Sequence, residues 1–194
     1  MKGRVSRPPV FAFGLDETLG GLPTSVILDA VAGTPGLDLG DLRRMPAQAL
    51  EETMALAEMV STERTPEARG AALFKEIFSE QDVAVARRVR QADDAVRLVS
   101  GALTYMVDRK DPKASVRQEG PRVNADRERV ELISHIKTRT SPLRGTFTVW
   151  AGIDDGAVVG VTITRRWHAP VQFTATTVQL LLAEIARRVS LAMR

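Results

Sequence analysis

A short run of cationic and aromatic residues offers the clearest chemistry in this chain. Arg165, Arg166, Trp167 and His168 are consecutive, and two guanidinium groups beside an aromatic ring and an imidazole could contact a phosphate and stack a base. Further basic residues lie in or next to the segment 110–122: Arg109, Lys110, Lys113, Arg117 and Arg122. Both groups could contact nucleic acid. The simpler interpretation, which the sequence favours, is a strand end and an exposed loop whose charges are solvated.

Acidic residues and histidines are too scattered to indicate catalysis. Glu131 and His135 are four apart, so the carboxylate could orient the imidazole, and Asp154, Asp155 and Glu184 could bind a hard cation. Surface or capping roles are the favoured interpretation of all five. The chain has two histidines and no cysteine, which excludes disulfides, thiolate sites and histidine-rich metal sites. We expect no catalytic residue, no metal and no cofactor, and an enzyme is the least expected class.

The segment Val10–Leu19 resembles the first motif of haloacid-dehalogenase-type phosphatases, in which an apolar strand precedes Asp-x-Asp-x-Thr-Leu. Asp16 and Thr18 match the second aspartate and the threonine, whereas Gly14 stands at the position of the nucleophile. Glycine cannot form an aspartyl-phosphate. The residues themselves favour a strand, an acidic turn and a helix, so we expect no phosphatase activity.

A second region is similar to two families. The residues 145–161 contain a glycine-rich strand, a Gly-x-Asp-Asp turn and a Val-x-Gly return strand, which is similar to Schlafen- or AlbA-type nucleic-acid-binding domains. Continued through Phe173 and Thr174 into the last helix, the region is also similar to the end of a GAF sensory domain. The first resemblance implies nucleic-acid binding and the second implies ligand sensing. Both families share a hairpin followed by a helix, and that common pattern is sufficient to produce both resemblances.

Composition and charge set wide limits on the class of protein. The 194 residues carry 27 basic and 24 acidic side chains, with 44% hydrophobic and 5% aromatic residues. This is enough apolar material for a core of aliphatic side chains. No apolar run is long enough to cross a membrane, and the basic start with two prolines does not resemble a signal peptide. We therefore expect a cytoplasmic protein.

An apolar stripe dominates the middle of the chain. Its members are spaced alternately four and three residues apart: Val85, Val89, Ala92, Val96, Val99, Leu103 and Met106. This spacing places them on one face of a long helix, which must be covered by a helix, a sheet or a second copy of the chain. The stripe therefore predicts a surface for packing or for assembly.

Local signals place the remaining elements. Caps, prolines and glycines predict helices over 24–33, 46–60 and 65–78, and Ser79 or Asp82 restarts the chain as the striped helix, which ends near Asp108. We expect a loop over 110–122 and a helix from Asn124 to Lys137. Alternating residues over 147–151 and 159–163, with Asp154-Asp155-Gly156 between them, predict a hairpin.

The two ends of the chain complete the expected fold. Val10–Phe13 is expected to add a strand to the hairpin, and a final helix follows a cap at Thr174, with a hydrophobic staple between Phe173 and Val178. The predicted fold class is α+β, with a helix-rich N-terminal and middle region and a C-terminal α-β-β-α unit built on a hairpin. We expect one domain over 1–194, with 1–122 and 123–194 as the alternative subdivision.

The expected function is that of a non-catalytic interaction or assembly protein. In this interpretation the apolar stripe oligomerises with a second copy or docks another protein. The alternative is a nucleic-acid-binding module that uses the basic segment and Arg165–His168. The third hypothesis is a GAF-like ligand-sensing domain.

Overall fold

The structure is a computed structural model that describes residues 24–33, 47–60, 66–139, 143–154 and 158–191. The chain divides into two compact units, Met1–Arg90 and Gln91–Arg194. The fold is α+β, as predicted. None of the described helices combines the length and the apolar character that a bilayer span requires. The predicted strand at Val10–Phe13, the phosphatase-like motif and the Asp155-Gly156 turn lie outside the described residues.

The first unit is built from helices. It contains α1 (Thr24–Gly33), α3 (Ala47–Val60), α4 (Pro66–Ile77) and the start of α5 (Glu80–Lys110), which confirms the predicted helices. Its core is aliphatic and aromatic, with Leu28, Leu50 and Phe74 fully buried. Helices α1 and α4 approach closely at Gly70, where an added Cβ would overlap the carbonyl oxygen of Leu28.

A reciprocal cap starts α5. The Ser79 hydroxyl accepts a hydrogen bond from the Asp82 backbone N–H at 3.2 Å, and the Asp82 carboxylate accepts one from the Ser79 N–H at 2.7 Å. These two bonds satisfy backbone donors that have no partner within the helix. Of the two predicted restart residues, Ser79 is therefore the cap, and Asp82 is its partner.

The second unit is an antiparallel sheet with two helices. Its strands are β1 (Ser115–Asn124), β2 (Arg129–Lys137), β3 (Gly145–Gly152), β4 (Val159–Thr164) and β5 (Val171–Ala175). The strand order follows the chain order from β1 to β5. The predicted hairpin is confirmed, because β3 and β4 pair antiparallel with Val149 opposite Val161.

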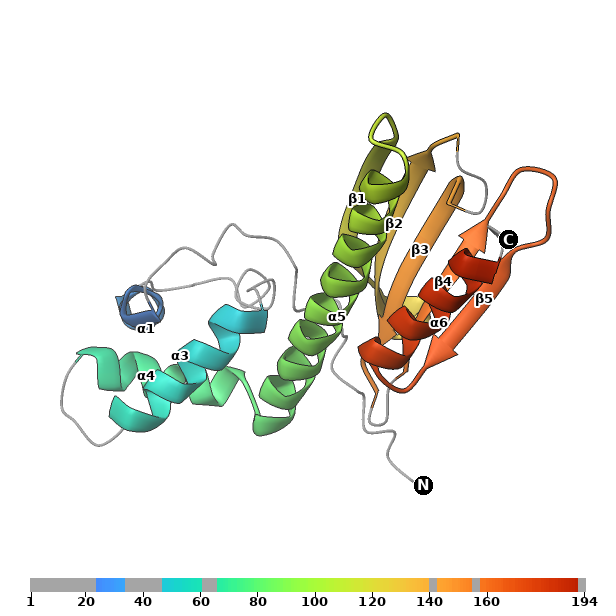
Figure 1. Cartoon of the computed structure of the whole chain (residues 1–194). Coiled ribbons are helices and arrows are strands. Elements are labelled where there is room, and N and C mark those ends of the chain that lie inside the picture. The colour runs from blue at the N-terminus through green and yellow to red at the C-terminus, as the bar shows by residue number, and fades with distance from the viewer. Residues whose placement is uncertain (1–23, 34–46, 61–65, 140–142, 155–157, 192–194) are drawn as a thin grey trace, which may run out of the picture. The chain divides into compact units, whose positions relative to one another are not determined.

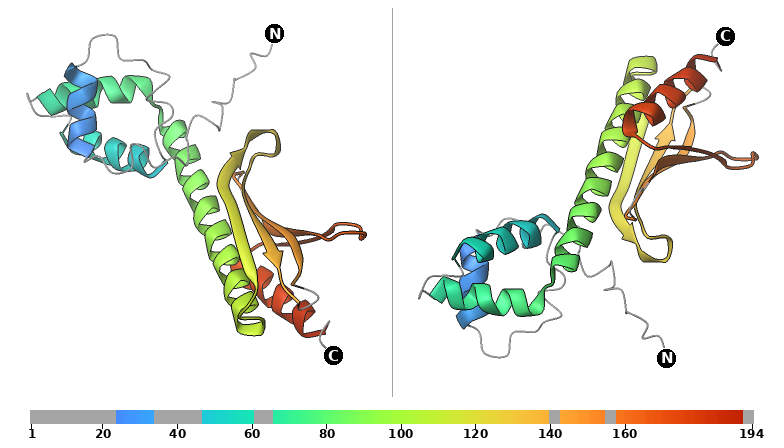
Figure 2. Two further views of the ribbon diagram at one scale, coloured as in Figure 1. Left: turned by 90° about the horizontal axis from the view of Figure 1, so that it is seen from above. Right: turned by 90° about the horizontal axis from the view of Figure 1, so that it is seen from below.

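Helix α5 and the final helix α6 (Val178–Leu191) lie on the same face of this sheet (Figures 1 and 2). The part of the α5 stripe that belongs to this unit is buried there, with Val96, Val99 and Leu103 fully enclosed. Polar contacts also join helix to sheet: the hydroxyls of Ser100 and Ser134 are 3.0 Å apart, and the Gln118 side-chain amide donates a hydrogen bond to the Ser100 hydroxyl at 2.9 Å. At the end of the stripe the buried residue is Val107, whereas Met106, which was predicted to be the last member, is partly exposed. Val107 follows Leu103 by four residues, and this spacing is closer to the 3.6 residues of a helical turn than the spacing of three that leads to Met106.

Two predicted elements before the hairpin are wrong. The segment 110–122 was expected to be a loop, yet β1 occupies most of it, and the ladder between β1 and β2 shifts register between Glu119 and Arg122 to absorb Gly120-Pro121. A proline is tolerated there because β1 is an edge strand. The expected helix from Asn124 is only the three-residue turn Ala125–Arg127, and β2 follows it.

The start of the last helix also differs from the prediction. Phe173 and Thr174 lie in β5, and the cap is Thr177, whose hydroxyl accepts a hydrogen bond from the Leu180 N–H at 3.3 Å. The predicted staple is therefore absent. The Phe173 ring instead contacts the Arg188 guanidinium, which lies 4.2 Å from the ring centroid. This cation–π contact links α6 to the edge strand β5.

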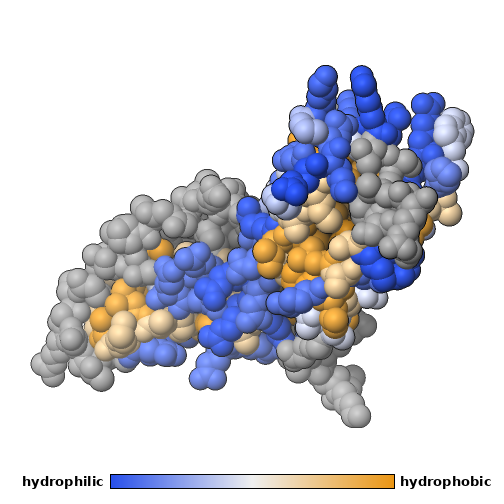
Figure 3. All heavy atoms as spheres, viewed as in Figure 1, coloured by the Kyte–Doolittle hydropathy of each residue, from blue (hydrophilic) through white to orange (hydrophobic). Residues whose placement is uncertain are grey.

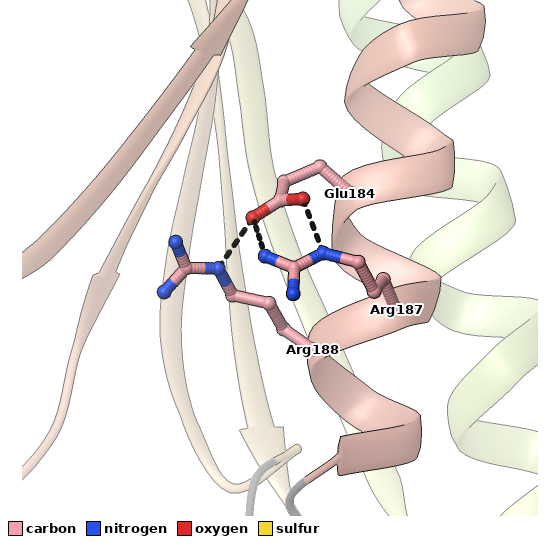
Figure 4. A network of polar contacts seen from close by, with 3 residues as sticks. All are labelled: Glu184, Arg187 and Arg188. Atoms are coloured by element: carbon pink, nitrogen blue, oxygen red, sulfur yellow. Dashed lines mark hydrogen bonds and ion pairs between the residues drawn. The ribbon is translucent and has the colours of Figure 1, made fainter.

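A carboxylate holds that arginine in place. Glu184 accepts hydrogen bonds from Arg187 and Arg188, as Figure 4 shows. These two guanidinium groups, Arg187 foremost, lower the pKa of Glu184 to about 2. Glu184 is thus a structural partner of α6 side chains.

Two leucines of α5 provide a test of this packing. Leu103 is 0% exposed and Leu98 is 58% exposed. We predict that Leu103→Ala lowers the free energy of unfolding by about 2–5 kcal/mol, because it leaves a cavity between α5 and the sheet. Leu98→Ala, the matched control on the same helix, should change it by less than about 0.5 kcal/mol. Urea unfolding followed by circular dichroism measures both, and equal losses would contradict the packing described.

Candidate nucleic-acid interface

Each of the five strands begins or ends at one particular end of the sheet. Strands β1, β3 and β5 begin at this end, whereas β2 and β4 finish there, because neighbouring strands of a meander run in opposite directions. The connections 111–114 and 165–170, and the described parts 138–139 and 143–144 of the connection between β2 and β3, therefore lie at the same end of the sheet. Figure 3 shows hydrophilic residues gathered at the upper end of this unit, where these strand ends lie.

A cleft of about 550 Å³ opens at this end of the sheet. We call it the basic cleft, because five of its lining residues are cationic: Lys137, Arg139, Arg144, Arg165 and Arg166. His135, Thr146, Trp167 and His168 complete its polar and aromatic lining, and none of the described lining residues is acidic. The cations come from two parts of the chain that are distant in sequence, one around the connection after β2 and one in the connection after β4, so their convergence is a property of the fold.

The floor of the basic cleft depends on a glycine. Gly145 begins β3 with a φ of 149°, and an added Cβ would lie 2.8 Å from the Thr164 carbonyl oxygen and 3.2 Å from the Arg165 side chain. A side chain at this position would push the end of β4 away. Glycine therefore lets Arg165 sit directly beside the start of β3.

Trp167 stands at the rim of the basic cleft. Its side chain is 87% exposed, and its φ of 67° lies in the left-handed region that bulky residues rarely adopt. The Arg166 guanidinium lies 5.0 Å from the ring centroid. Trp167 therefore projects into solvent and does not cover the edge of the core.

A smaller cleft of about 440 Å³ adjoins the basic cleft and shares three cations with it, Lys137, Arg139 and Arg144. It adds Lys113, which precedes β1. The positive charge is therefore continuous from the end of β4 to the start of β1. We call this run of cations at the strand ends, from Arg165 to Lys113, the cationic track.

Asp111 is the one acidic residue among the described residues that line the two clefts. Its carboxylate accepts hydrogen bonds from the Thr138 hydroxyl at 2.8 Å, the Arg139 N–H at 3.1 Å and the Lys113 N–H at 3.1 Å. These bonds tie the connection before β1 to the connection after β2. The Arg139 N–H, foremost, and the Thr138 hydroxyl lower the pKa of Asp111. Asp111 thus positions the loops that carry Lys113 and Arg139.

The structure separates the predicted basic residues into two groups. Arg165–His168 line the basic cleft, and Lys113 lines the adjoining one. Arg109 and Lys110 end α5, and Arg109 lies 6.0 Å from the Tyr105 ring. Arg117 pairs with Glu119. Arg122 pairs in register with Glu131 at the far end of β1, about 20 Å along the strand.

Three contributors to the track were not singled out from the sequence. Lys137, Arg139 and Arg144 lie on either side of Ser141-Pro142 in the sequence, and the expected helix from Asn124 placed Lys137 at a helix end. The signal that could have found them is the density of basic residues around this dipeptide. Without the strand order, nothing indicates that they lie beside Arg165.

The predicted carboxylate–imidazole pair is not formed. Glu131 pairs with Arg129, whose guanidinium stacks 4.8 Å from the Trp150 ring, and His135 contacts Thr146 at 3.2 Å and Glu119 at 3.4 Å. Within the described residues no group of three metal-ligating side chains occurs. Glu184 is engaged by arginines, as described above, and Asp154 is exposed.

Comparison with known protein families, with curated proteins and with solved structures found no match to this chain. The geometry of the site is therefore the basis on which a function can be assigned.

Asp111 provides a test of this architecture by pH. Because its folded pKa lies below the unfolded value near 3.8, its contribution to stability is fully present above that pH. The contribution is lost as pH falls through the lowered folded value. We expect carbon-detected NMR titration to place the Asp111 pKa below 3.8. Asp111→Ala should lower the free energy of unfolding above pH 3.8, and the difference from the wild type should shrink as pH falls below that value. A titration at or above 3.8 would show that the three hydrogen bonds do not form.

Proposed function

We propose that this protein is a nucleic-acid-binding module that holds phosphates along the cationic track at the strand ends of its sheet. The observation that carries the proposal is the convergence of Lys137, Arg139, Arg144, Arg165 and Arg166 on one cleft whose described lining contains no carboxylate. Clustering like charges costs free energy unless an anionic ligand offsets it. Phosphate contacts from arginine and lysine are the usual source of nucleic-acid affinity.

The form of the track favours a polymer over a single phosphate. Two clefts share their central cations, so several phosphates could be held in sequence. Among the described residues no carboxylate lies within ion-pair distance of Lys137, Arg144 or Arg166. Within the part of the chain that the structure describes, a ligand can therefore meet these cations without first breaking a salt bridge.

An assembly role through the apolar stripe has less support. The stripe members from Ala92 to Leu103 are at most 4% exposed within the single chain. A partner could reach them only after α5 had separated from its own sheet. Oligomerisation or docking of another protein through the stripe, like ligand sensing, stays a prediction. A cytoplasmic location is part of the proposal.

The dependence of binding on salt tests the proposal. We predict that a fluorescein-labelled oligonucleotide binds at 50 mM salt, and that affinity falls steeply by 200 mM. The triple variant Arg139→Ala/Arg144→Ala/Arg166→Ala should bind more weakly on all sequences and should reduce the slope of log K against log salt by about 0.7–0.9 for each lost phosphate contact. Fluorescence anisotropy measures both quantities.

Arg122→Ala is the matched control, since Arg122 is an exposed arginine of the same sheet that lies outside both clefts. It should leave the affinity and the slope unchanged. No binding at 50 mM salt, or equal effects of the cleft variant and the control, would refute the proposal.

A further inference from the structure

The two tryptophans of this unit have opposite environments. Trp150 is 7% exposed, whereas Trp167 is 87% exposed and stands at the rim of the basic cleft. A tryptophan this exposed contributes little free energy of apolar burial to folding, although tryptophan has the largest apolar side chain. Its place beside five cations distinguishes it from a scattered surface hydrophobe. The position suits a ligand that presents a flat apolar surface and negative charge together.

The surroundings of the ring indicate which contact it can make. The Arg166 guanidinium, 5.0 Å from the centroid, occupies space near the indole, and the exposed fraction leaves most of the ring surface open. An aromatic ring supported by an arginine is the arrangement on which unpaired nucleobases stack. The phosphate next to a stacked base could then enter the cleft and meet Arg165 or Arg144.

We propose, on the basis of the function proposed above, that the ligand is single-stranded nucleic acid with one unpaired base stacked on Trp167. In a duplex the faces of the bases are covered by neighbouring bases, so an indole at the rim of a cleft can meet only backbone and groove edges. A single strand offers base faces and phosphates at once. Trp167 therefore selects against duplex, whereas the cations bind either form.

The length of the track sets the length of strand that it can hold. Strands β4 and β1 are separated by three strand spacings, or about 14 Å. Bases that remain stacked advance about 3.4 Å each along a strand. The cationic track from Arg165 to Lys113 thus accommodates roughly four nucleotides, with the stacked base at the Trp167 end.

The experiment compares ligands that have equal numbers of phosphates. Single-stranded DNA, the same strand with abasic sites in place of its bases, and a matched duplex are titrated into the full chain and into Trp167→Ala and Trp167→Phe. We expect the wild-type chain to bind the single strand roughly five- to 150-fold more tightly than the abasic strand, which corresponds to about 1–3 kcal/mol for one stacked base. Trp167→Ala should abolish this preference, and Trp167→Phe should keep most of it.

Tryptophan fluorescence provides an independent readout. Single-stranded DNA should quench the wild-type emission, and the quenching should disappear in Trp167→Phe, where buried Trp150 is the remaining tryptophan. Oligonucleotides of increasing length should gain affinity up to about four nucleotides and change little beyond that. Because Trp167 is exposed, circular dichroism should show its variants to be folded.

The outcomes separate this inference from the proposed function. Equal affinity for the single strand, the abasic strand and the duplex, with salt-dependent binding retained, would overturn the stacking role of Trp167 and leave phosphate binding intact. Binding to none of the three at low salt would refute the proposed function itself. A preference for the single strand that survives in Trp167→Ala would place the base contact elsewhere and would also overturn the inference.

Discussion

The burial of α5 against one face of the antiparallel sheet is the contact on which the second unit depends. Val96, Val99 and Leu103 are fully enclosed, as are Val130, Val149 and Val161 of the three central strands. This apolar burial fixes which face of each strand points inward, because alternate residues of a strand lie on opposite faces. The hydroxyl contact between Ser100 and Ser134 adds a specific register to a contact that is otherwise non-directional.

Once this face is covered, the ends of the strands are the place where charge can collect. The meander brings the connections after β2 and β4 next to the connection before β1. Each connection carries its own cations, and Asp111 links two of them through three hydrogen bonds. The core therefore positions the track indirectly: it holds the strands, the strands set the spacing of the connections, and Asp111 limits their motion. Repulsion among the cations is the cost of this arrangement.

The opposite face of the sheet uses charge differently. Arg129 pairs with buried Glu131 and stacks on Trp150, so its charge is neutralised and its guanidinium is packed. On α6, which covers the other face, Glu184 accepts hydrogen bonds from two arginines and balances their charge. Carboxylate partners balance the charge of these arginines, whereas Lys137, Arg144 and Arg166 at the strand ends have no carboxylate partner among the described residues. Context, and not residue type, distinguishes structural arginines from candidate ligand contacts in a chain rich in arginine.

The sequence by itself determined the helices, the central hairpin and the α+β class, because caps, prolines and 3.6-residue periodicity are local signals. It misassigned 124–137, since Glu131 and His135, four residues apart, share a face in a strand as well as in a helix. Polar Ser134 also interrupted the apolar alternation of Val130, Leu132 and Ile136. The Arg165–His168 segment was visible as a motif, but Lys137, Arg139 and Arg144, which line the same cleft, were not. Only the tertiary structure decided that they converge, because strand order and register depend on pairing between segments that are remote along the chain.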